Sequence, residues 1–488
     1  MKHLNKNFVV TLLIFLTQSF NLSIAQSNLN GKDLFAGTTL VSEFENSMVF
    51  IGKVNDKLLF MSRNNVSPSK NTLFYTAKPK LYIIDKTSNK IINTVNLKQL
   101  FKSNKITDAY VIKGRIFFSI QKSGSEIELF ELDESGEILS RKSTANLGLK
   151  NLKPNAIIPS ADGQYLLLIN QSGRMDLTYG KKRSRKTNFA VLDLKLNLIH
   201  KGLFTLNKKC EYLKITSFVY SSGNITMLMA TNAYPYIGKI DANSQIVKLG
   251  DWNSMSDFCV LNSSIGEMKI GFISSKDNIG GLGLIVLNGG GEILSNKICE
   301  TFKIFSSDLS RINTQYANLV ITDVLESSDA LTFIIQNFGT YSYVRSGGSG
   351  GVTSSYTQSY STYNDIYIIK QDANFSNMWT QHVRNRFSYN STLIDYTING
   401  KLFLYYTSYK ISTDKEYNEG LPLTNEIILS REQYNGTLGK CVVFDFESGE
   451  HLKSQNISYL SSYQQKESGE HIIWHRSNNK FKAYMLVK

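Results

Sequence analysis

Four aspartates are the residues of this sequence best suited to do chemistry. They occur in short segments of similar character: Asp108 in ITDAYVI, Asp257 in MSDFCVL, Asp323 in VITDVLE and Asp395 in LIDYTIN. Two carboxylates held at a suitable separation can act as acid and base on a glycosidic bond. The structural alternative is that each carboxylate caps a strand end by accepting backbone N–H groups. All four aspartates are candidates for catalysis, for example with Asp323 and Asp395 as the pair.

Other catalytic and metal-binding patterns are poorly supported. The run 347–351 matches G-x-S-x-G with Ser349 as the nucleophile, but such an elbow needs a helix after the turn. The residues that follow, VTSSYTQSYSTY, are poor helix formers, so we interpret this run as the tip of a long loop. His471 and His475 share a strand-like segment, in which four residues span about 13 Å, too far to clamp one metal. We expect no metal and no cofactor.

The elements that position these residues are strands. Short apolar runs rich in Val, Ile, Tyr and Phe recur along the whole chain, whereas helical periodicity is nearly absent. Within them a hairpin signature repeats, in which an apolar strand ends in an acid or amide and a turn with Gly or Asn follows. The anchor positions of this repeat are Asp85, Asp133, Asp193, Asp241, Asn288, Asp372 and Glu447.

The repeat predicts an all-β fold, a single β-propeller. Asp85 and Asp133 are 48 positions apart, as are Asp193 and Asp241, and two further strands precede each hairpin. Four strands in such a unit form a propeller blade. We expect eight blades, with seven as the alternative, and we expect the segment 32–42 to supply the outer strand of an incomplete last unit. Strands from both termini would then close the ring and remove an exposed edge.

The hairpins ELDESGEIL and FDFESGEHL resemble the repeats of the quinoprotein-like propeller family, the type found in pyrroloquinoline-quinone dehydrogenases. In that family a tryptophan at the end of the repeat locks neighbouring blades together. The equivalent positions here hold Leu139, Leu294 and Leu452, and Trp379 is the one tryptophan near such a position. The resemblance implies the propeller repeat, and it implies no cofactor site because no cofactor-binding pattern matches.

Four long insertions, 64–79, 171–188, 339–364 and 407–439, each fall between the second and third strands of a predicted unit. Connections of this kind emerge on one face of a propeller, and long loops on a rigid scaffold commonly carry function. The loop 171–188 is cationic, and the loop 339–364 is rich in tyrosine, as binding loops often are. The ligand-binding candidates on this face are Tyr179, Lys181, Lys182, Arg183, Arg185, Tyr341, Tyr343, Tyr356 and Tyr360.

Residues 1–25 read as a secretory signal peptide, with Lys2 and Lys6 before an apolar run and Ser23-Ile24-Ala25 at the cleavage site. Residues 26–488 then form the propeller domain, which we expect to be periplasmic or extracellular. Export permits disulfides, and three pairings are open, with buried free thiols as the alternative. The four cysteines are Cys210, Cys259, Cys299 and Cys441.

The formal net charge of +14 suggests an anionic glycan, a surface polymer or another polyanion as partner. We expect no specific nucleic-acid site and no transmembrane segment. The leading hypothesis is therefore an exported, non-catalytic propeller that binds a glycan, surface polymer or partner protein through its loop-rich face. The alternatives are a carbohydrate-active enzyme that uses the aspartates, and an assembly scaffold of the cell envelope.

Overall fold

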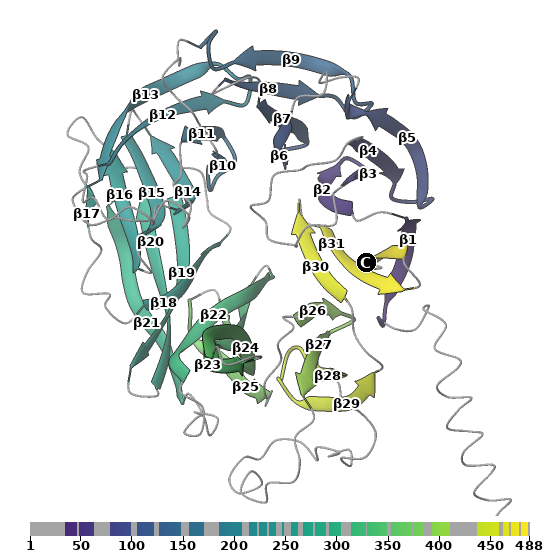
Figure 1. The fold of residues 1–488 in the computed structure, drawn as a ribbon, viewed down its shortest axis with the longest axis vertical. Helices are drawn as coiled ribbons and strands as arrows, with labels where there is room; N and C mark the ends of the chain where they lie inside the picture. Colours follow the sequence, from purple (N-terminus) through teal and green to yellow (C-terminus); the bar gives the residue numbers. More distant parts are fainter. Residues whose placement is uncertain are drawn as a thin grey trace, which may run out of the picture.

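The fold is a β-propeller of four-stranded antiparallel sheets, seen in a computed structural model (Figure 1). The structure describes residues 35–45, 48–62, 79–98, 105–121, 126–147, 156–169, 185–206, 214–221, 224–231, 234–240, 246–247, 255–261, 267–276, 279–288, 292–303, 314–327, 329–348, 353–372, 374–383, 393–409, 437–457, 462–467, 470–477 and 480–486.

Seven sheets are each built from four consecutive strands, and we call them blades one to seven in chain order. The eighth sheet, here the terminal sheet, joins three C-terminal strands to the first strand of the described chain, in the order β1-β32-β31-β30. Each sheet has an innermost strand, which lies nearest the middle of the molecule. The innermost strands are β2 (Met48–Val54), β6 (Lys105–Ile112), β10 (Ala156–Pro159), β14 (Lys214–Ser221), β18 (Met255–Leu261), β22 (Thr314–Glu326), β26 (Leu393–Ile398) and β30 (Ser462–Glu467).

The second and third strands of each sheet follow outward. The second strands are β3 (Lys57–Ser62), β7 (Arg115–Gln121), β11 (Tyr165–Ile169), β15 (Asn224–Thr231), β19 (Glu267–Lys276), β23 (Ala330–Gly348), β27 (Lys401–Tyr409) and β31 (Glu470–Ser477). The third strands are β4 (Lys80–Asp85), β8 (Ile127–Leu132), β12 (Arg185–Asp193), β16 (Tyr234–Ile240), β20 (Ile279–Asn288), β24 (Thr353–Asp372), β28 (Thr437–Asp445) and β32 (Lys480–Leu486).

In blades one to seven the outermost strand follows the hairpin anchor that the sequence repeat predicts, whereas the terminal sheet takes its outermost strand from the N-terminal part of the chain. The outermost strands are β5 (Lys90–Asn96), β9 (Ile138–Ser143), β13 (Leu198–Leu206), β17 (Ile246–Val247), β21 (Ile293–Lys303), β25 (Asn377–Val383), β29 (His451–Ile457) and, in the terminal sheet, β1 (Thr38–Phe44).

The acid at the end of the third strand builds the turn chemically. The Oδ1 atom of Asp133 accepts N–H bonds from Ser135 and Glu137, at 2.8 Å each, and Gly136 supplies the positive φ of 90°. In blade seven the acid that plays this role is Asp445, not the predicted anchor Glu447: Asp445 accepts the N–H of Ser448 at 2.8 Å. Asp445 holds the turn because it ends strand β28, two residues before Glu447.

Apolar side chains fill the spaces between neighbouring sheets. Each of eight buried clusters takes residues from two sheets that follow one another, from blades one and two round to the terminal sheet and blade one. In the last of these, Trp474 lies edge-on to Phe60 with ring centroids 5.6 Å apart. Buried apolar surface between sheets is therefore the main force that holds each sheet beside the next.

The terminal sheet pairs a strand from the N-terminal part of the chain with C-terminal strands, and it contacts the sheets on both sides. Strand β1 pairs antiparallel with β32 from Thr38 opposite Leu486 to Phe44 opposite Phe481, as the sequence predicts for an outer strand supplied by the N-terminal part. Strand β30 contacts both β26 of blade seven and β2 of blade one.

No helix in the part of the chain that the structure describes is long and apolar enough to cross a membrane.

Candidate functional site

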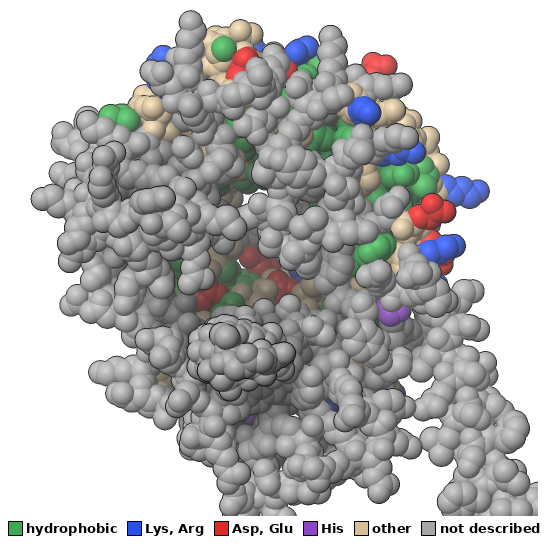
Figure 2. All heavy atoms as spheres, viewed as in Figure 1, with side chains coloured by type: hydrophobic (Ala, Val, Ile, Leu, Met, Phe, Trp, Pro, Cys, Tyr) green, Lys and Arg blue, Asp and Glu red, His purple; other side chains and the backbone are tan. Residues whose placement is uncertain are grey.

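Three innermost strands of adjacent sheets bring two of the predicted aspartates together. Asp323 comes from β22, Asp395 from β26, and a lysine that the sequence analysis did not single out, Lys466, comes from β30. Lys466 is 71 positions from Asp395 and 143 positions from Asp323 along the chain, yet its ammonium group bonds to both carboxylates. Figure 2 shows the middle of one face of the molecule as a hollow, with Asp and Glu side chains on its floor.

The cluster is a closed network of hydrogen bonds. Lys466 Nζ donates to Asp323 Oδ2 and, at 3.1 Å, to Asp395 Oδ2. Gln464 Nε2 donates to Asp395 Oδ1 at 2.7 Å and to Asp323 Oδ2 at 3.3 Å, and its Oε1 accepts the Asp395 N–H at 3.0 Å. His471 Nε2 lies 2.8 Å from the same Oε1. Gln464 and Lys466 lie two positions apart on β30, so their side chains lie on the same side of the strand.

The two carboxyl groups have opposite pKa shifts. Burial, together with the neighbouring charge of Asp395, raises the pKa of Asp323 to about 8, although Lys466 opposes the rise. Burial also acts to raise the pKa of Asp395, but Lys466 and the hydrogen bonds from Asp323 and Gln464 outweigh it and lower that pKa. Asp395 is fully buried, whereas Asp323 keeps 15% of its side chain exposed. The pair therefore holds one proton, on Asp323, near neutral pH.

Such a pair has the proton distribution of an acid and a base, but not the open geometry. A glycosidase places its two carboxyl groups on either side of the substrate, with room between them. Here an ammonium group lies between the carboxylates, and it neutralises Asp395. Burial lowers the pKa of His471 to about 3, with the charge of Lys466 adding to the effect, so this imidazole is neutral near pH 7. The cluster joins three sheets, and Asp323 is the more exposed of its two carboxyl groups.

The other two aspartates behave differently. Asp257 Oδ2 accepts the backbone N–H of Ile321 at 2.8 Å, so it joins β18 to the neighbouring inner strand β22. Asp108 lies in β6, directly after an irregularity in the pairing with β7, and its side chain is outside the described residues. Asp257 and Asp323 also follow such irregularities. Asp323 lies near the end of β22, whereas Asp257 and Asp395 lie near the starts of β18 and β26, because β22 is a longer strand.

Of the four predicted long loops, one is largely strand. Strands β23 and β24 pair without a break from Phe338 opposite Tyr363 to Gly348 opposite Thr353, so most of the range 339–364 is a two-stranded ribbon. The prediction of a loop is wrong here because Tyr, Thr and Ser at alternate positions favour extended backbone, and the glycines gather at the ribbon tip. Ser349 itself lies outside the described residues.

The register of the ribbon relates the tyrosines that the sequence analysis proposed as ligand-binding. Tyr341 is opposite Tyr360, Tyr343 is opposite Gln358, and Tyr356 is opposite Arg345. Opposite and alternate positions share a face of a sheet, so these four tyrosine positions fall on one face of the ribbon.

The other proposed binding residues are mostly beyond the described ranges. Tyr179, Lys181, Lys182 and Arg183 fall between β11 and β12, outside the described residues, and Arg185 is the first residue of β12. The insertions near 64–79 and 407–439 also fall largely outside, and they connect β3 to β4 and β27 to β28. All four insertions therefore connect a second strand to a third strand, as predicted.

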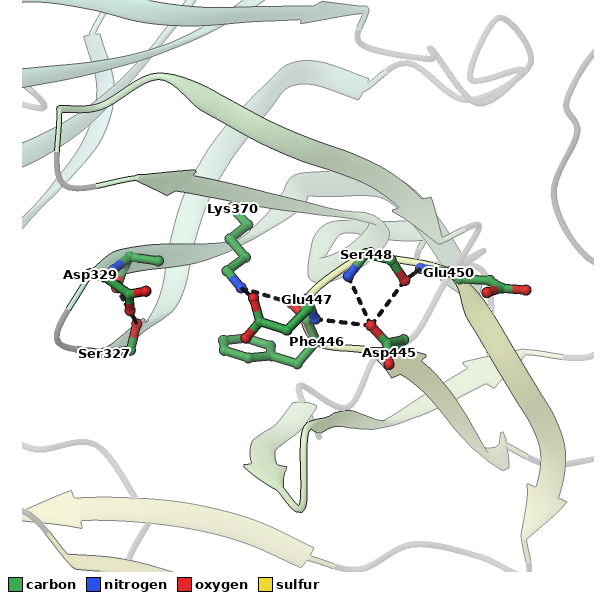
Figure 3. Close-up of polar contacts among 9 residues, drawn as sticks. Ser327, Asp329, Lys370, Asp445, Phe446, Glu447, Ser448 and Glu450 are labelled. Carbon is green, nitrogen blue, oxygen red and sulfur yellow. Dashed lines mark hydrogen bonds and ion pairs between the residues drawn. The ribbon is translucent and has the colours of Figure 1, made fainter.

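A second lysine, Lys370 of β24, joins blades six and seven at a turn (Figure 3). Its Nζ donates to the Phe446 carbonyl at 3.0 Å and to Glu447 Oε2 at 2.9 Å, and it lies 4.3 Å from the centre of the Phe446 ring. Beside it, Trp379 of β25 packs directly against Gly449 in the turn of blade seven.

Trp379 therefore acts as the inter-blade lock that the quinoprotein-like repeat implies. A Cβ atom added to Gly449 would lie 2.6 Å from Trp379 Cδ2. Gln381 supports the same contact by donating from Nε2 to the Gly449 carbonyl at 2.8 Å. At the boundary of blades one and two, Val95 takes the corresponding place against Gly136.

Lys466 and Gln464 were not predicted as site residues from the sequence, and His471 was considered there only as a metal ligand. One signal could have found the first two: the segment SYQQKE forms an innermost strand, where apolar residues are usual, yet it is polar along its whole length. Three other histidines, His200, His382 and His451, lie in outermost strands.

Cys259, Cys299 and Cys441 are free thiols, and Cys210 lies outside the described residues. Burial raises the pKa of Cys441 to about 11, so this thiol is protonated and unreactive near neutral pH. Within the described ranges, no group of three or more His, Cys, Asp and Glu side chains is arranged to hold a metal ion.

No protein-family model matches the sequence, and no curated protein matches it. Similar solved structures include the quinohemoprotein alcohol dehydrogenase from Comamonas testosteroni, which is 10% identical over 92% of this chain and 76% of that chain, with a TM-score of 0.40. The enzyme ADHIIG from Pseudomonas putida HK5 is 11% identical with the same coverage and the same TM-score. The Chaetomium thermophilum Sqt1, solved with the N-terminus of ribosomal protein L10, is 10% identical over 91% of this chain and 99% of that chain, with a TM-score of 0.41.

Proposed function

We propose that this protein is an exported, non-catalytic β-propeller that binds an anionic glycan or surface polymer through one elaborated face. The observation that carries the proposal is the common location of the four long insertions. Each connects a second strand to a third strand, and these connections emerge at the same end of every sheet. A rigid ring that presents its longest segments on one side is the usual arrangement of a binding scaffold.

The chemistry of the insertions favours an anionic polymer. The insertion 171–188 contains five cations within six residues, and the chain as a whole carries a net charge of +14. Like charges at that density repel one another unless anions lie between them. The ribbon of blade six adds four tyrosine positions on one face, and aromatic rings with a hydroxyl group offer both stacking area and hydrogen bonds to a sugar.

Binding to an array of uronate and sulfated glycans tests this function. We expect the mature protein to bind, and we expect a variant with Lys181, Lys182, Arg183 and Arg185 changed to Ala to bind at least about tenfold more weakly. A matched control changes four cations of the outermost strands instead, Lys90, Lys142, Lys201 and Lys453, and should retain binding. Absence of binding by the wild-type protein would reject the proposal and favour an envelope scaffold. Export is tested separately, by N-terminal sequencing of the mature protein for a start at Gln26.

A second candidate function, acid–base chemistry on a glycan, is favoured by the opposite pKa shifts of Asp323 and Asp395. In this role Asp323 would donate a proton, and Lys466 would have to move before a substrate could lie between the carboxylates. Turnover of a polysaccharide that is lost in both Asp323→Asn and Asp395→Asn, and retained in the quadruple loop variant, would support it. Binding without turnover by the wild-type protein would exclude it for the polymers tested.

We further infer that the terminal sheet is an eighth blade that closes the ring. Its support is the pairing of β1 with β32, together with the apolar clusters on both of its sides. Ion pairs also join the terminal sheet to its neighbours. Lys466 bonds to blades six and seven, and Glu470 accepts bonds from Lys53 and Lys86 of blade one at 3.0 and 2.8 Å. Removal of residues 26–45 should therefore lower the stability of the whole molecule, as monitored by thermal unfolding.

A further inference from the structure

Strand β24 has one paired edge and one edge that is largely open. Along one side it pairs with β23 over its full length, from Ala330 opposite Asp372 to Gly348 opposite Thr353. Along the other side it pairs with β25 only from Ile366 to Gln371. Among the described residues, no strand pairs with the stretch 353–364 on that side. A row of backbone N–H and C=O groups is therefore presented along the projecting part of the strand.

The composition of this edge does nothing to prevent strand addition. Natural edge strands commonly carry lysine, proline or a bulge that blocks pairing with another chain. The run 353–363, TSSYTQSYSTY, contains no charged residue, no proline and no glycine, and its pairing with β23 is regular throughout. Its Thr and Tyr residues favour strand, and an isolated two-stranded ribbon is only marginally stable in water. This ribbon therefore gains stability when another strand is added.

The same run has a twofold symmetry in its sequence about Gln358. In an antiparallel pair of two copies centred on this residue, the residue at each position lies opposite one of similar chemistry: Ser355 opposite Ser361, Tyr356 opposite Tyr360 and Thr357 opposite Ser359. Cross-strand aromatic pairs and hydroxyl pairs both stabilise sheets. A twofold axis requires this self-complementarity, because each copy presents the same surface to the other.

We propose that two copies of this chain associate through the open edges of β24, antiparallel and centred on Gln358. The two ribbons then form one four-stranded sheet in the order β23-β24-β24-β23. Because opposite and alternate positions share a face, the four tyrosine positions of each copy fall on a common face of this sheet. The dimer thus doubles the aromatic surface that the proposed binding function uses, although the association itself does not depend on that function.

Site-directed cross-linking tests the register. Gln358→Cys should cross-link to a dimer with a short bis-maleimide, because the two thiols would face each other across the axis. Ser355→Cys and Ser361→Cys should cross-link efficiently only when mixed, since each lies opposite the other. Val344→Cys, placed on β23 of the same ribbon, is the matched control and should give no more dimer than the wild-type protein with its native cysteines. Equal yields from Gln358→Cys and Val344→Cys would overturn the proposal.

Sedimentation velocity tests the association without cross-linking. Gln358→Lys places two like charges opposite each other on the axis, and we expect it to weaken the dimer at least about tenfold. Ser346→Lys adds the same charge to β23, away from the axis, and should leave the dimer intact. A wild-type protein that is monomeric at all accessible concentrations, or identical behaviour of the two variants, would contradict the proposal. Glycan binding by a monomeric wild-type protein would leave the proposed function standing.

Discussion

Two lysines join neighbouring sheets of this propeller, and their surroundings differ in charge. Lys466, at the inner ring, bonds to two carboxylates, of which Asp395 is fully buried. Lys370, at the turn between blades six and seven, bonds to one carboxylate, and that residue, Glu447, is 75% exposed. Lys370 also meets a carbonyl oxygen and an aromatic ring, which need no counter-charge. The inner lysine is thus part of an ionic network, whereas the outer lysine is mainly a packing element.

The difference shows where a perturbed carboxylate can arise in a repeat fold. Innermost strands approach one another around the hollow, so polar side chains from successive sheets meet at close range. At the blade boundary, the turn projects toward solvent and its acids remain hydrated: the pKa of Asp445 is lowered by hydrogen bonds from Ser448. Within the described ranges, the inner cluster combines burial with two like charges, and this combination raises the pKa of one of them.

Replacing the inner lysine should have the largest effect. In Lys466→Met the buried Asp395 loses its counter-charge, and an unpaired buried charge is strongly destabilising. We expect the free energy of unfolding at pH 7 to fall by about 3 kcal/mol, measured by urea denaturation. The loss should shrink toward pH 4, where the carboxylates can take up protons. An effect no larger than that of Lys370→Met would show that the two lysines are equivalent.

The turn beside Lys370 should depend on packing more than on charge. Gly449→Ala introduces a Cβ atom against Trp379 and also strains a backbone with φ of 73°. We expect a loss of about 2 kcal/mol, seen as a lower midpoint in chemical unfolding.

Gly400→Ala is the matched control for Gly449→Ala. Gly400 has a similar φ of 69°, but a Cβ atom there would meet nothing within 4 Å. Backbone strain alone should therefore cost about 1 kcal/mol in this variant. Equal losses in the two variants would indicate that Trp379 yields to the added methyl group and does not act as a rigid lock.

The raised pKa of Asp323 gives the inner cluster a dependence on pH that the turn lacks. The folded state keeps this proton up to pH about 8, whereas the unfolded chain loses it near pH 4. Between these values the folded state binds more protons, so the contribution of Asp323 to stability falls as pH rises. Asp323→Asn should remove that fall, so its stability relative to wild type should rise by about 1 kcal/mol for each pH unit between pH 5 and pH 8.

Unfolding of Asp323→Asn and wild type should be compared at pH 5 and pH 8. The difference should be smaller at pH 5, only about one pH unit above the ordinary pKa of an aspartate, than at pH 8. Asp445→Asn is the matched control, because the pKa of Asp445 is shifted in the opposite direction and its variant should lose stability at both values. A difference between Asp323→Asn and wild type that is the same at pH 5 and pH 8 would contradict a raised pKa for Asp323.

The sequence predicts the propeller repeat because its determinants are local. Asp133 and Gly136 lie three positions apart and build one turn, so the same pattern can be recognised wherever it recurs. The inner cluster has no such local pattern: its charges come from three sheets, and only the curvature of the ring brings Lys466 to Asp323. The ribbon of blade six was predicted as a loop because of its glycines and serines, although its Tyr and Thr residues favour strand, and the pairing of β23 with β24 decides the outcome.

Replacing the outer lysine should have the smallest effect of this series. Lys370→Met keeps the aliphatic stem that packs on Phe446, and Glu447 remains solvated without its partner, so little electrostatic energy is lost. The Phe446 carbonyl loses one donor, and we expect a total loss of about 1 kcal/mol with no dependence on pH between 5 and 8. Lys370→Ala, which also removes the stem, should lose more stability than Lys370→Met. If the two variants are equally destabilised, the charge of Lys370 matters more than its packing, and the contrast with Lys466 is one of degree.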